Sequence, residues 1–333
     1  MTLHTLRNLM FPAVLAAGLA TLAGCATAPA GVPAAPLADH HQHLFSPAIV
    51  KLINSPGFTP ILASDLVGML DTAGIRQALI LSPADMYAKP GRNLPNERAQ
   101  VMAENDWTAA QAALYPTRLK AMCGVNPLSA YALEELARCS TAPGFARGMK
   151  LHLGNADVQL DNPAHLARMK AFFAAANQHG MALVVHTRAS ISLKRPYGPE
   201  QGRILLEELF PMAPDVVIQI AHLAGSGSGP GYDDPAAHSV MEVLAQAFAR
   251  NDPRLRNVWG DVASSADRNI SPANAQKMAQ RIRQIGVKKI LYGSDAATAR
   301  NLQPGEAWQA FRKLPLTDAQ FATIARNLAP TMR

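Results

Sequence analysis

Residues 182–186 read ALVVH and residues 216–222 read VVIQIAH, and these two stretches decide the fold. Each stretch is an almost unbroken run of apolar residues that ends in a histidine. Such runs are typical of parallel strands buried on both faces of a sheet. Because parallel neighbours are joined by a crossover that usually contains a helix, the two stretches predict an α/β protein.

The same pattern recurs eight times along the chain. Strand-like runs lie at 37–44, 76–81, 119–125, 146–151, 182–186, 216–222, 257–262 and 289–293, and helical periods between them include 163–178, 202–210, 236–250 and 272–285. The runs are roughly 36 residues apart, which suits one strand and one helix of a barrel. Eight such units predict a (β/α)8 TIM-like barrel, with a doubly wound open sheet as the alternative. No linker divides residues 38–333, so we expect a single barrel domain there.

The N-terminus predicts a bacterial lipoprotein signal peptide. An apolar run at residues 9–22 follows Arg7 and is too short for a comfortable membrane span. The run leads into Leu22-Ala23-Gly24-Cys25, which resembles a lipobox, in which the cysteine thiol takes a lipid. Ordinary cleavage that leaves Cys25 free is the alternative.

Three segments follow from this interpretation. We expect residues 1–24 to be the signal peptide, residues 25–37 to be a flexible tether from lipidated Cys25, and residues 38–333 to be the enzyme domain. The expected location is the bacterial cell envelope, where the exported protein is anchored to a membrane by its lipid.

Two further cysteines lie inside the predicted barrel. Cys123 falls in the run 119–125, and Cys139 lies near the end of the helical segment that follows. An oxidising compartment would allow them to pair. The sequence nevertheless favours two buried, unpaired side chains, with a disulfide as the alternative.

Polar residues gather where the predicted strands end, and a barrel of this type places its reacting groups there. The first run ends in Asp39-His40-His41-Gln42-His43, and strand alternation puts Asp39, His41 and His43 on one face. Two imidazoles at this spacing can chelate one metal ion. The later runs end with Lys150 and His152 in GMKLH, His186 in LVVHTR, His222 in IQIAHLAG and Asp295 in LYGSD. Histidines scattered through a core would not all lie at strand ends, so the joint pattern indicates a metal site.

On these residues the chain resembles the metal-dependent amidohydrolase superfamily over roughly residues 38–330, and within it the amidohydrolase-related group. That group includes hydrolases and non-oxidative decarboxylases. The resemblance implies one divalent metal ion, zinc first, with manganese or a second ion as alternatives. It gives as metal ligands His41, His43, His186 and Asp295. It makes His222 either a further ligand or an electrophile that faces the substrate.

Three cationic or imidazole side chains keep alternative roles. Lys150 either is carboxylated and bridges two ions, or stays a cation that holds substrate or a neighbouring acid, and we favour a single ion. His152 lies on the same strand face as Lys150 and is likewise a candidate for a bridging or substrate-binding role. Arg188 lies two residues after His186, and its planar fork suits a substrate carboxylate, with a surface ion pair as the alternative.

The implied chemistry is attack by a metal-activated water. A zinc ion with an open position lowers the pKa of its water from about 15.7 towards 7. Asp295 would act as general base and then acid, and His222 would help to stabilise the oxyanion. The first hypothesis is a metal-dependent hydrolase of a small amide, ester or lactone. The alternatives are a non-oxidative decarboxylase of a small carboxylic acid on the same site, and a non-catalytic ligand-binding lipoprotein.

The distribution of charge bears on the expected partners, and a glycine-rich segment bears on the mouth of the site. The chain has 31 Lys and Arg against 24 Asp and Glu, and residues 277–333 hold ten of the basic and three of the acidic residues. Without interleaved aromatic residues, this basic flank favours a solvated outer face over a patch on lipid headgroups, and nucleic acid is not an expected partner. Residues 225–234, GSGSGPGYDD, predict a mobile loop over the site mouth rather than a phosphate loop. Whether Tyr87, Trp107 and Trp259 line the pocket is left open.

Overall fold

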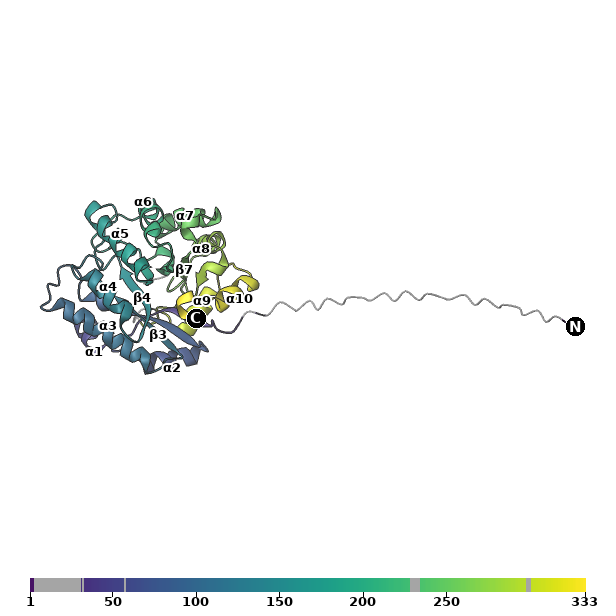
Figure 1. Cartoon of the computed structure of the whole chain (residues 1–333), viewed down its shortest axis with the longest axis horizontal. Coiled ribbons are helices and arrows are strands. Elements are labelled where there is room, and N and C mark those ends of the chain that lie inside the picture. The colour runs from purple at the N-terminus through teal and green to yellow at the C-terminus, as the bar shows by residue number, and fades with distance from the viewer. Residues whose placement is uncertain (3–30, 32, 57, 228–233, 298–300) are drawn as a thin grey trace. The chain divides into compact units, whose positions relative to one another are not determined.

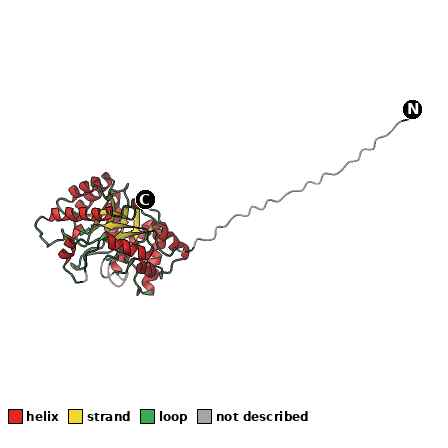
Figure 2. Ribbon diagram, turned by 90° about the horizontal axis from the view of Figure 1, so that it is seen from below, coloured by secondary structure: helices red, strands yellow, loops and turns green. Residues whose placement is uncertain are grey.

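Eight parallel strands follow one another in chain order around the centre of the molecule (Figure 1). They are β1 (Ala38–Gln42), β2 (Gln77–Leu81), β3 (Leu119–Gly124), β4 (Phe145–His152), β5 (Ala182–His186), β6 (Ile218–Ile220), β7 (Val258–Asp261) and β8 (Ile290–Leu291). Seven of the predicted runs contain the corresponding strand, and β4 extends one residue beyond its predicted run, 146–151, at each end. The helices surround the strands, as Figure 2 shows.

This computed structural model describes residues 1–2, 31, 33–56, 58–227, 234–297 and 301–333. Residues 31–333 form one compact unit. The predicted lipobox and most of the tether and signal peptide lie outside the described residues, as do residues 228–233 of the predicted glycine-rich loop. No helix within the described part of the chain is long and apolar enough to cross a membrane.

The sheet closes on itself between its last and first strands. The backbone N–H of His40 donates to the carbonyl of Tyr292 at 2.9 Å, and that of Asp295 donates to the carbonyl of His41 at 2.9 Å. Asp39 adds side-chain bonds across the same seam, because its carboxyl accepts from the N–H of Ser294 at 3.0 Å and from its hydroxyl at 2.6 Å. The predicted TIM-like barrel is therefore confirmed, and the open sheet is excluded.

Ten α-helices lie within the described residues. They are α1 (Pro47–Ile53), α2 (Ala63–Ala73), α3 (Glu97–Ala113), α4 (Ala132–Thr141), α5 (Pro163–Gln178), α6 (Pro199–Ile204), α7 (Pro235–Ala249), α8 (Pro272–Ile285), α9 (Pro304–Phe311) and α10 (Asp318–Arg326). Four of these helices begin in the same way. A side-chain oxygen of the N-cap residue accepts an N–H of the first turn, and a proline directly follows the N-cap residue. These N-cap residues are Ser46, Asn162, Asp234 and Ser271. The predicted helix at 202–210 begins earlier, at Pro199, and continues through a π-helical turn at Leu205–Leu209.

Strand alternation divides the core into an interior and an outer layer. In β5, Ala182 and Val184 pack inside the barrel, where they join Leu79, Met122 and Leu291. Leu183 and Val185 belong to the larger outer layer between strands and helices. The next inward position after Val184 is His186, so the interior changes from apolar to polar towards the carboxyl ends of the strands.

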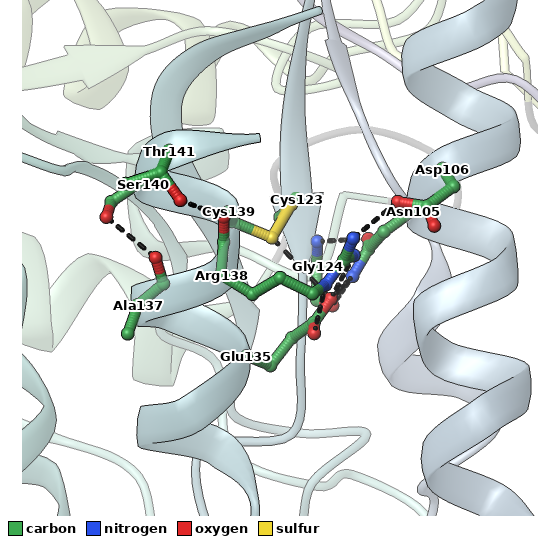
Figure 3. The surroundings of a disulfide bond; sticks show 10 residues. All are labelled: Asn105, Asp106, Cys123, Gly124, Glu135, Ala137, Arg138, Cys139, Ser140 and Thr141. Atoms are coloured by element: carbon green, nitrogen blue, oxygen red, sulfur yellow. Dashed lines mark hydrogen bonds and ion pairs between the residues drawn. A yellow bond between two sulfur atoms is a disulfide. The ribbon is translucent and has the colours of Figure 1, made fainter. Parts of the chain in front are cut away.

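Cys123 and Cys139 form a disulfide, with their Cα atoms 6.4 Å apart (Figure 3). The expectation of two unpaired side chains was therefore wrong. Cys123 points from β3 into the outer layer, where it meets Cys139 of α4. Periodicity shows that Cys123 faces outward, but it does not show which turn of which helix packs there.

A buried polar network continues from this disulfide (Figure 3). Asn105 of α3 donates to the carbonyl of Gly124 at 3.0 Å and to Glu135 of α4 at 2.8 Å, and its own oxygen accepts from the N–H of Gly124. Arg138 forms two bonds to Glu135, at 2.8 and 2.7 Å. The network and the disulfide together fix α3 and α4 against β3.

Removing the disulfide should lower the stability of the barrel. It closes a loop with a sequence separation of 16 residues, for which chain entropy gives about 3 kcal/mol. Urea unfolding of the oxidised protein and of Cys123→Ala/Cys139→Ala should show this loss. A reductant should bring the wild type to the level of the double variant and leave the variant unchanged. Equal stability of the oxidised and reduced wild type would contradict this expectation.

Candidate active site

A cavity of about 180 Å³ lies at the carboxyl ends of the strands. Within the described residues, its lining comes from six of the eight units of the barrel and consists of His41, His43, Phe45, Pro83, Asp85, Met86, Lys150, His152, Asn155, His186, His222, Ser226, Gly227 and Asp295. All the strand-end residues that the sequence predicts as site residues are among them. Arg188 is not.

The two histidines of the first strand have fixed ring orientations. Nδ1 of His41 lies 3.0 Å from a carboxyl oxygen of Asp261, and Nδ1 of His43 lies 2.5 Å from the carbonyl of Leu81. Because both partners are acceptors, they assign the ring proton to Nδ1. Both rings therefore present an unprotonated Nε2, which is the form of imidazole that binds metal ions.

His222 is held in the same tautomer. Its Nδ1 lies 2.7 Å from the carbonyl of Ala263, and its backbone N–H donates to Asp261 at 2.8 Å. The residues His222, Leu223 and Ala224 all have left-handed backbones, with φ of 57°, 46° and 66°. Such strain costs on the order of 1–3 kcal/mol per residue and is concentrated at functional sites. Residue 227 must be glycine, because a Cβ there would lie 2.5 Å from Nε2 of His222.

Asp261 organises this part of the site, and the sequence analysis missed it. It is fully buried and accepts from Nδ1 of His41, from the N–H of His222 and, at 2.6 Å, from the amide of Gln219. The signal was present, since Asp261 closes the seventh strand just as Asp295 follows the eighth. Applied to every strand, the strand-end criterion finds it.

His152 has the opposite tautomer. The backbone N–H of Asn155 donates to its Nδ1 at 3.1 Å, which assigns the ring proton to Nε2. The ring stacks on that of His186, with centroids 3.8 Å apart and planes at 14°. His152 is therefore a hydrogen-bond donor in the wall of the cavity.

Burial keeps the imidazole cluster neutral. It lowers the pKa of His43 to about 3, and it lowers well below the usual value the pKa of His41, His152, His186 and His222. Burial also lowers the pKa of Lys150, against the attraction of the Asp261 and Asp295 carboxylates. The Lys150 amine lies 3.3 Å from Nε2 of His41.

Asp295 completes the cluster. Its backbone is left-handed, with φ 54°, and the amide of Asn301 donates to its carboxyl at 3.0 Å. Burial raises the pKa of Asp295 well above its usual value, although Lys150 acts in the opposite direction. Its Oδ1 lies 3.6 Å from Nε2 of His43. A lone pair and a carboxyl oxygen thus face each other, and a cation between them would stabilise both.

Two groups in the site could hold a metal ion. The ligand atoms of His41, His43 and Asp295 lie within 4.8 Å of one another, and so do those of His41, His222 and Asp261. Three of the four predicted ligands are thus brought together. Among the described residues His186 belongs to neither group and instead lies beside His222, with ring centroids 4.9 Å apart.

Arg188 has other partners. Its Nε donates to Asp234, the cap of α7, and its guanidinium lies 4.6 Å from the centre of the Tyr197 ring. This corresponds to the ion-pair alternative rather than to a carboxylate anchor in the cavity.

Asp85 and Asn155 form a second polar wall that the sequence analysis also missed. Asp85 follows β2 by four residues, is buried, and accepts from the Asn155 amide at 3.1 Å. Burial raises the pKa of Asp85 to about 6. A substrate group that meets this wall must offer a hydrogen-bond donor or be uncharged.

The fold and the site together define a barrel enzyme with an imidazole and carboxylate metal centre. A family model described as Amidohydrolase matches residues 39–327, so the chain belongs to this family. It is a metal-dependent enzyme of the amidohydrolase type. No curated protein matches the sequence.

Solved structures share the fold at low sequence identity. One is 5-carboxyvanillate decarboxylase from Sphingomonas paucimobilis, with 17% identity, a TM-score of 0.61 and coverage of 87% of this chain and 96% of that chain. A probable 2-pyrone-4,6-dicarboxylic acid hydrolase from Acinetobacter baumannii, with citric acid bound, has 17% identity, a TM-score of 0.54 and coverage of 87% and 96%. A third is 5-carboxyvanillate decarboxylase from Novosphingobium aromaticivorans, complexed with manganese and 4-hydroxy-3-methoxy-5-nitrobenzoic acid, with 15% identity, a TM-score of 0.57 and coverage of 88% and 94%.

Asp85→Asn should stabilise the metal-free protein at neutral pH. The folded-state pKa of Asp85 is raised to about 6, so the wild type loses stability as the pH rises from about 4 through 6, while the variant has no charge to bury. The variant should match the wild type at pH 4 and exceed it by up to about 3 kcal/mol at pH 7.5. Thermal unfolding after chelation across this range measures the difference. A difference in stability between the two proteins that does not change with pH would show that burying the Asp85 charge does not cost stability.

Proposed function

We propose that the protein hydrolyses a small amide, ester or lactone at a site that holds one divalent metal ion. The observation that carries this proposal is the Asp295 carboxyl, which is buried beside the imidazole cluster and 3.6 Å from Nε2 of His43.

The donor atoms fit a divalent cation. We infer that His41, His43 and Asp295 hold the ion, with His222 close enough to His41 to add a fourth ligand, since their ring centroids are 4.4 Å apart. A mixed imidazole and carboxylate set suits zinc and manganese. The manganese in the Novosphingobium decarboxylase supports manganese for this site. The resemblance to the amidohydrolase superfamily supports zinc equally well. When bound, the ion supplies a Lewis acid and lowers the pKa of water.

The side chains of this site divide the remaining tasks. Asp295, oriented by Asn301, takes the proton from the attacking water and returns it to the leaving group. His152 donates from Nε2 to the substrate oxygen on which negative charge develops. The His222 ring proton is engaged by Ala263, so a neutral His222 serves as a ligand and not as the predicted electrophile.

The charges that line the cavity do not select one substrate class. Two carboxyl groups, Asp85 and Asp295, face one lysine, Lys150, and Arg188 is paired elsewhere with Asp234. A divalent ion would add two positive charges, so the loaded site suits a carboxylate as well as a neutral substrate. A non-oxidative decarboxylase is the second candidate, because most of the similar solved structures compared here are decarboxylases and Lys150 could hold one carboxylate.

A substrate panel separates these two candidates. The metal-loaded protein would be assayed against small esters, lactones, amides and aromatic carboxylic acids, with parallel detection of released acid and of carbon dioxide. Release of acid without carbon dioxide, abolished by a chelator, is the expected result. Release of carbon dioxide alone would establish the decarboxylase.

Asp295→Asn should abolish turnover while the metal content stays close to that of the wild type. The amide keeps an oxygen for the metal but cannot take a proton, and loss of a general base costs about 10²–10⁴-fold in kcat. Metal analysis and kcat on the best substrate of the panel measure both effects. The control is Asp252→Asn, because Asp252 pairs with Arg254 away from the site. Retained turnover would remove the base role.

His152 should act through its donor. His152→Phe keeps the stack on His186 but removes the hydrogen bond, and we expect kcat to fall about 10²–10³-fold with little change in KM. His152→Gln can still donate and should retain more activity than the phenylalanine variant. Equal kcat in the wild type and in His152→Phe would show that His152 only fills space.

We also propose that the protein is exported and anchored through a lipid on Cys25, with residues 1–24 removed, residues 25–37 as the tether and residues 38–333 as the enzyme domain. The Cys123–Cys139 disulfide supports an oxidising compartment. Mass spectrometry of the membrane fraction tests this location. An unmodified Cys25 in the mature protein would contradict it.

A further inference from the structure

Basic side chains gather at the amino ends of the strands, at the opposite end of the barrel from the imidazole cavity. Because all eight strands are parallel, the residues that precede or begin them meet at one end. Arg326 ends α10, which packs against residues 287–289 just before β8. Together with residues beside the starts of β2, β4 and β8, it forms what we call the basic face, which consists of Arg76, Arg147, Lys288, Lys289 and Arg326. All but Lys289 are exposed.

The chain enters the barrel through the basic face. The backbone N–H of Arg76 donates to the carbonyl of Leu37 at 3.2 Å, and the N–H of Leu37 donates to the carbonyl of Ala325 at 2.7 Å. Leu37 directly precedes β1, so the end of the proposed tether lies between Arg76 and the end of α10. Cys25 lies twelve residues earlier. A flexible chain of that length spans about 20 Å, so a lipid on Cys25 would hold this end of the barrel close to the membrane.

The charge of the basic face is not neutralised by nearby acids. Within the described residues, none of its five members forms an ion pair with an acidic side chain, whereas acids at the same end pair with other arginines, as in Asp71–Arg118, Asp215–Arg256 and Asp252–Arg254. An oxygen of the terminal residue, Arg333, accepts from Lys120 at 3.0 Å. The helix dipole favours a cation in the last turn of a helix, but only Arg326 of the five lies in the last turn of an α-helix.

The fold redistributes the basic residues of segment 277–333. Arg281 is buried and pairs with Glu242 of α7 at 3.2 Å, so it adds nothing to an exposed patch. Three other basic residues of this segment belong to the basic face, where Arg76 and Arg147 join them from distant parts of the chain. The charge therefore gathers at one end of the barrel and not along the outer side of α8.

A partly exposed aromatic ring lies beside these cations. Trp259, the second residue of β7, packs against the interior of the barrel, as do Val217 and Leu328, and all three are only partly buried. The Lys289 amine lies 4.8 Å from the centre of the Trp259 ring. Tryptophan together with lysine and arginine is typical of surfaces that lie against lipid headgroups.

We propose that the basic face contacts the anionic phospholipid surface to which the chain is anchored. The mouth of the site, at the opposite end of the barrel, then faces away from the membrane and receives its substrate from the aqueous side. This orientation rests on the proposed anchor at Cys25. The attraction between the basic face and the headgroups needs neither the anchor nor the proposed hydrolysis.

Sedimentation with phosphatidylglycerol vesicles tests this attraction. Residues 31–333, which form one compact unit, are used so that neither the signal peptide nor the lipid contributes. One basic residue near an anionic surface strengthens binding roughly fivefold, so Arg76→Gln/Lys288→Gln/Arg326→Gln should bind about a hundredfold more weakly than the wild type. Binding of the wild type should weaken at high salt and be lost on phosphatidylcholine vesicles.

The matched control removes three charges from the other end of the barrel. Lys51, Lys89 and Lys194 are exposed and lie in the segments that follow β1, β2 and β5. Lys51→Gln/Lys89→Gln/Lys194→Gln should bind the vesicles as the wild type does, since its net charge changes equally but the basic face is intact.

A second measurement keeps the test decisive if the basic-face variant does not fold. Phosphatidylglycerol with brominated acyl chains should quench the fluorescence of the bound wild type through Trp259. Trp259→Phe should remove most of this quenching, whereas Trp107→Phe, in the middle of α3, should keep it.

Three results would overturn the proposal. The first is no sedimentation of the wild type with anionic vesicles at low salt. The second is equal binding by the basic-face variant and the control variant, or quenching that survives in Trp259→Phe. The third is tighter binding to a soluble polyanion such as heparin than to the vesicles, because the face would then recognise an acidic polymer.

Discussion

The carboxyl group of Asp261 is the interaction on which the site depends. It lies inside the barrel without access to solvent and accepts from Nδ1 of His41, the N–H of His222, the N–H of Ala263 and the amide of Gln219. A carboxyl group buried in a protein interior is tolerated when such bonds satisfy its oxygens. These bonds tie β1, β6 and β7 together and fix the tautomer of His41. The strained turn at His222 is stable because Asp261 holds its backbone.

The barrel interior changes its chemistry along the strands. Away from the carboxyl ends of the strands, residues such as Val184 and Met122 fill the centre of the barrel and exclude water. At the carboxyl ends, the inward-facing positions carry His186, Lys150 and His41, all of them buried. Burial keeps the imidazoles neutral and therefore able to bind a cation, and it weakens the hold of Lys150 on its proton. The apolar base of the barrel thus contributes to the function by setting the protonation of the layer above it.

Periodicity was enough to predict the barrel and most of its site. Runs such as ALVVH give the strand and the inward face together, so His186 and His41 could be placed at strand ends from the sequence alone. The disulfide could not be predicted, since it depends on how α4 packs on β3. The tautomers of His152 and His222 depend on the N–H of Asn155 and the carbonyl of Ala263, which only loop geometry brings to the rings. Arg188 had the right parity, but a cap residue 46 positions away takes its guanidinium.

The central claim is that the lone pairs of His41 and His43 and the carboxyl of Asp295 share one divalent cation. Anomalous scattering from crystals grown with manganese tests it most directly. The account predicts one strong peak within bonding distance of all three side chains, about 2.0–2.3 Å from each ligand atom. A peak elsewhere in the barrel, or no peak at saturating manganese, would contradict it.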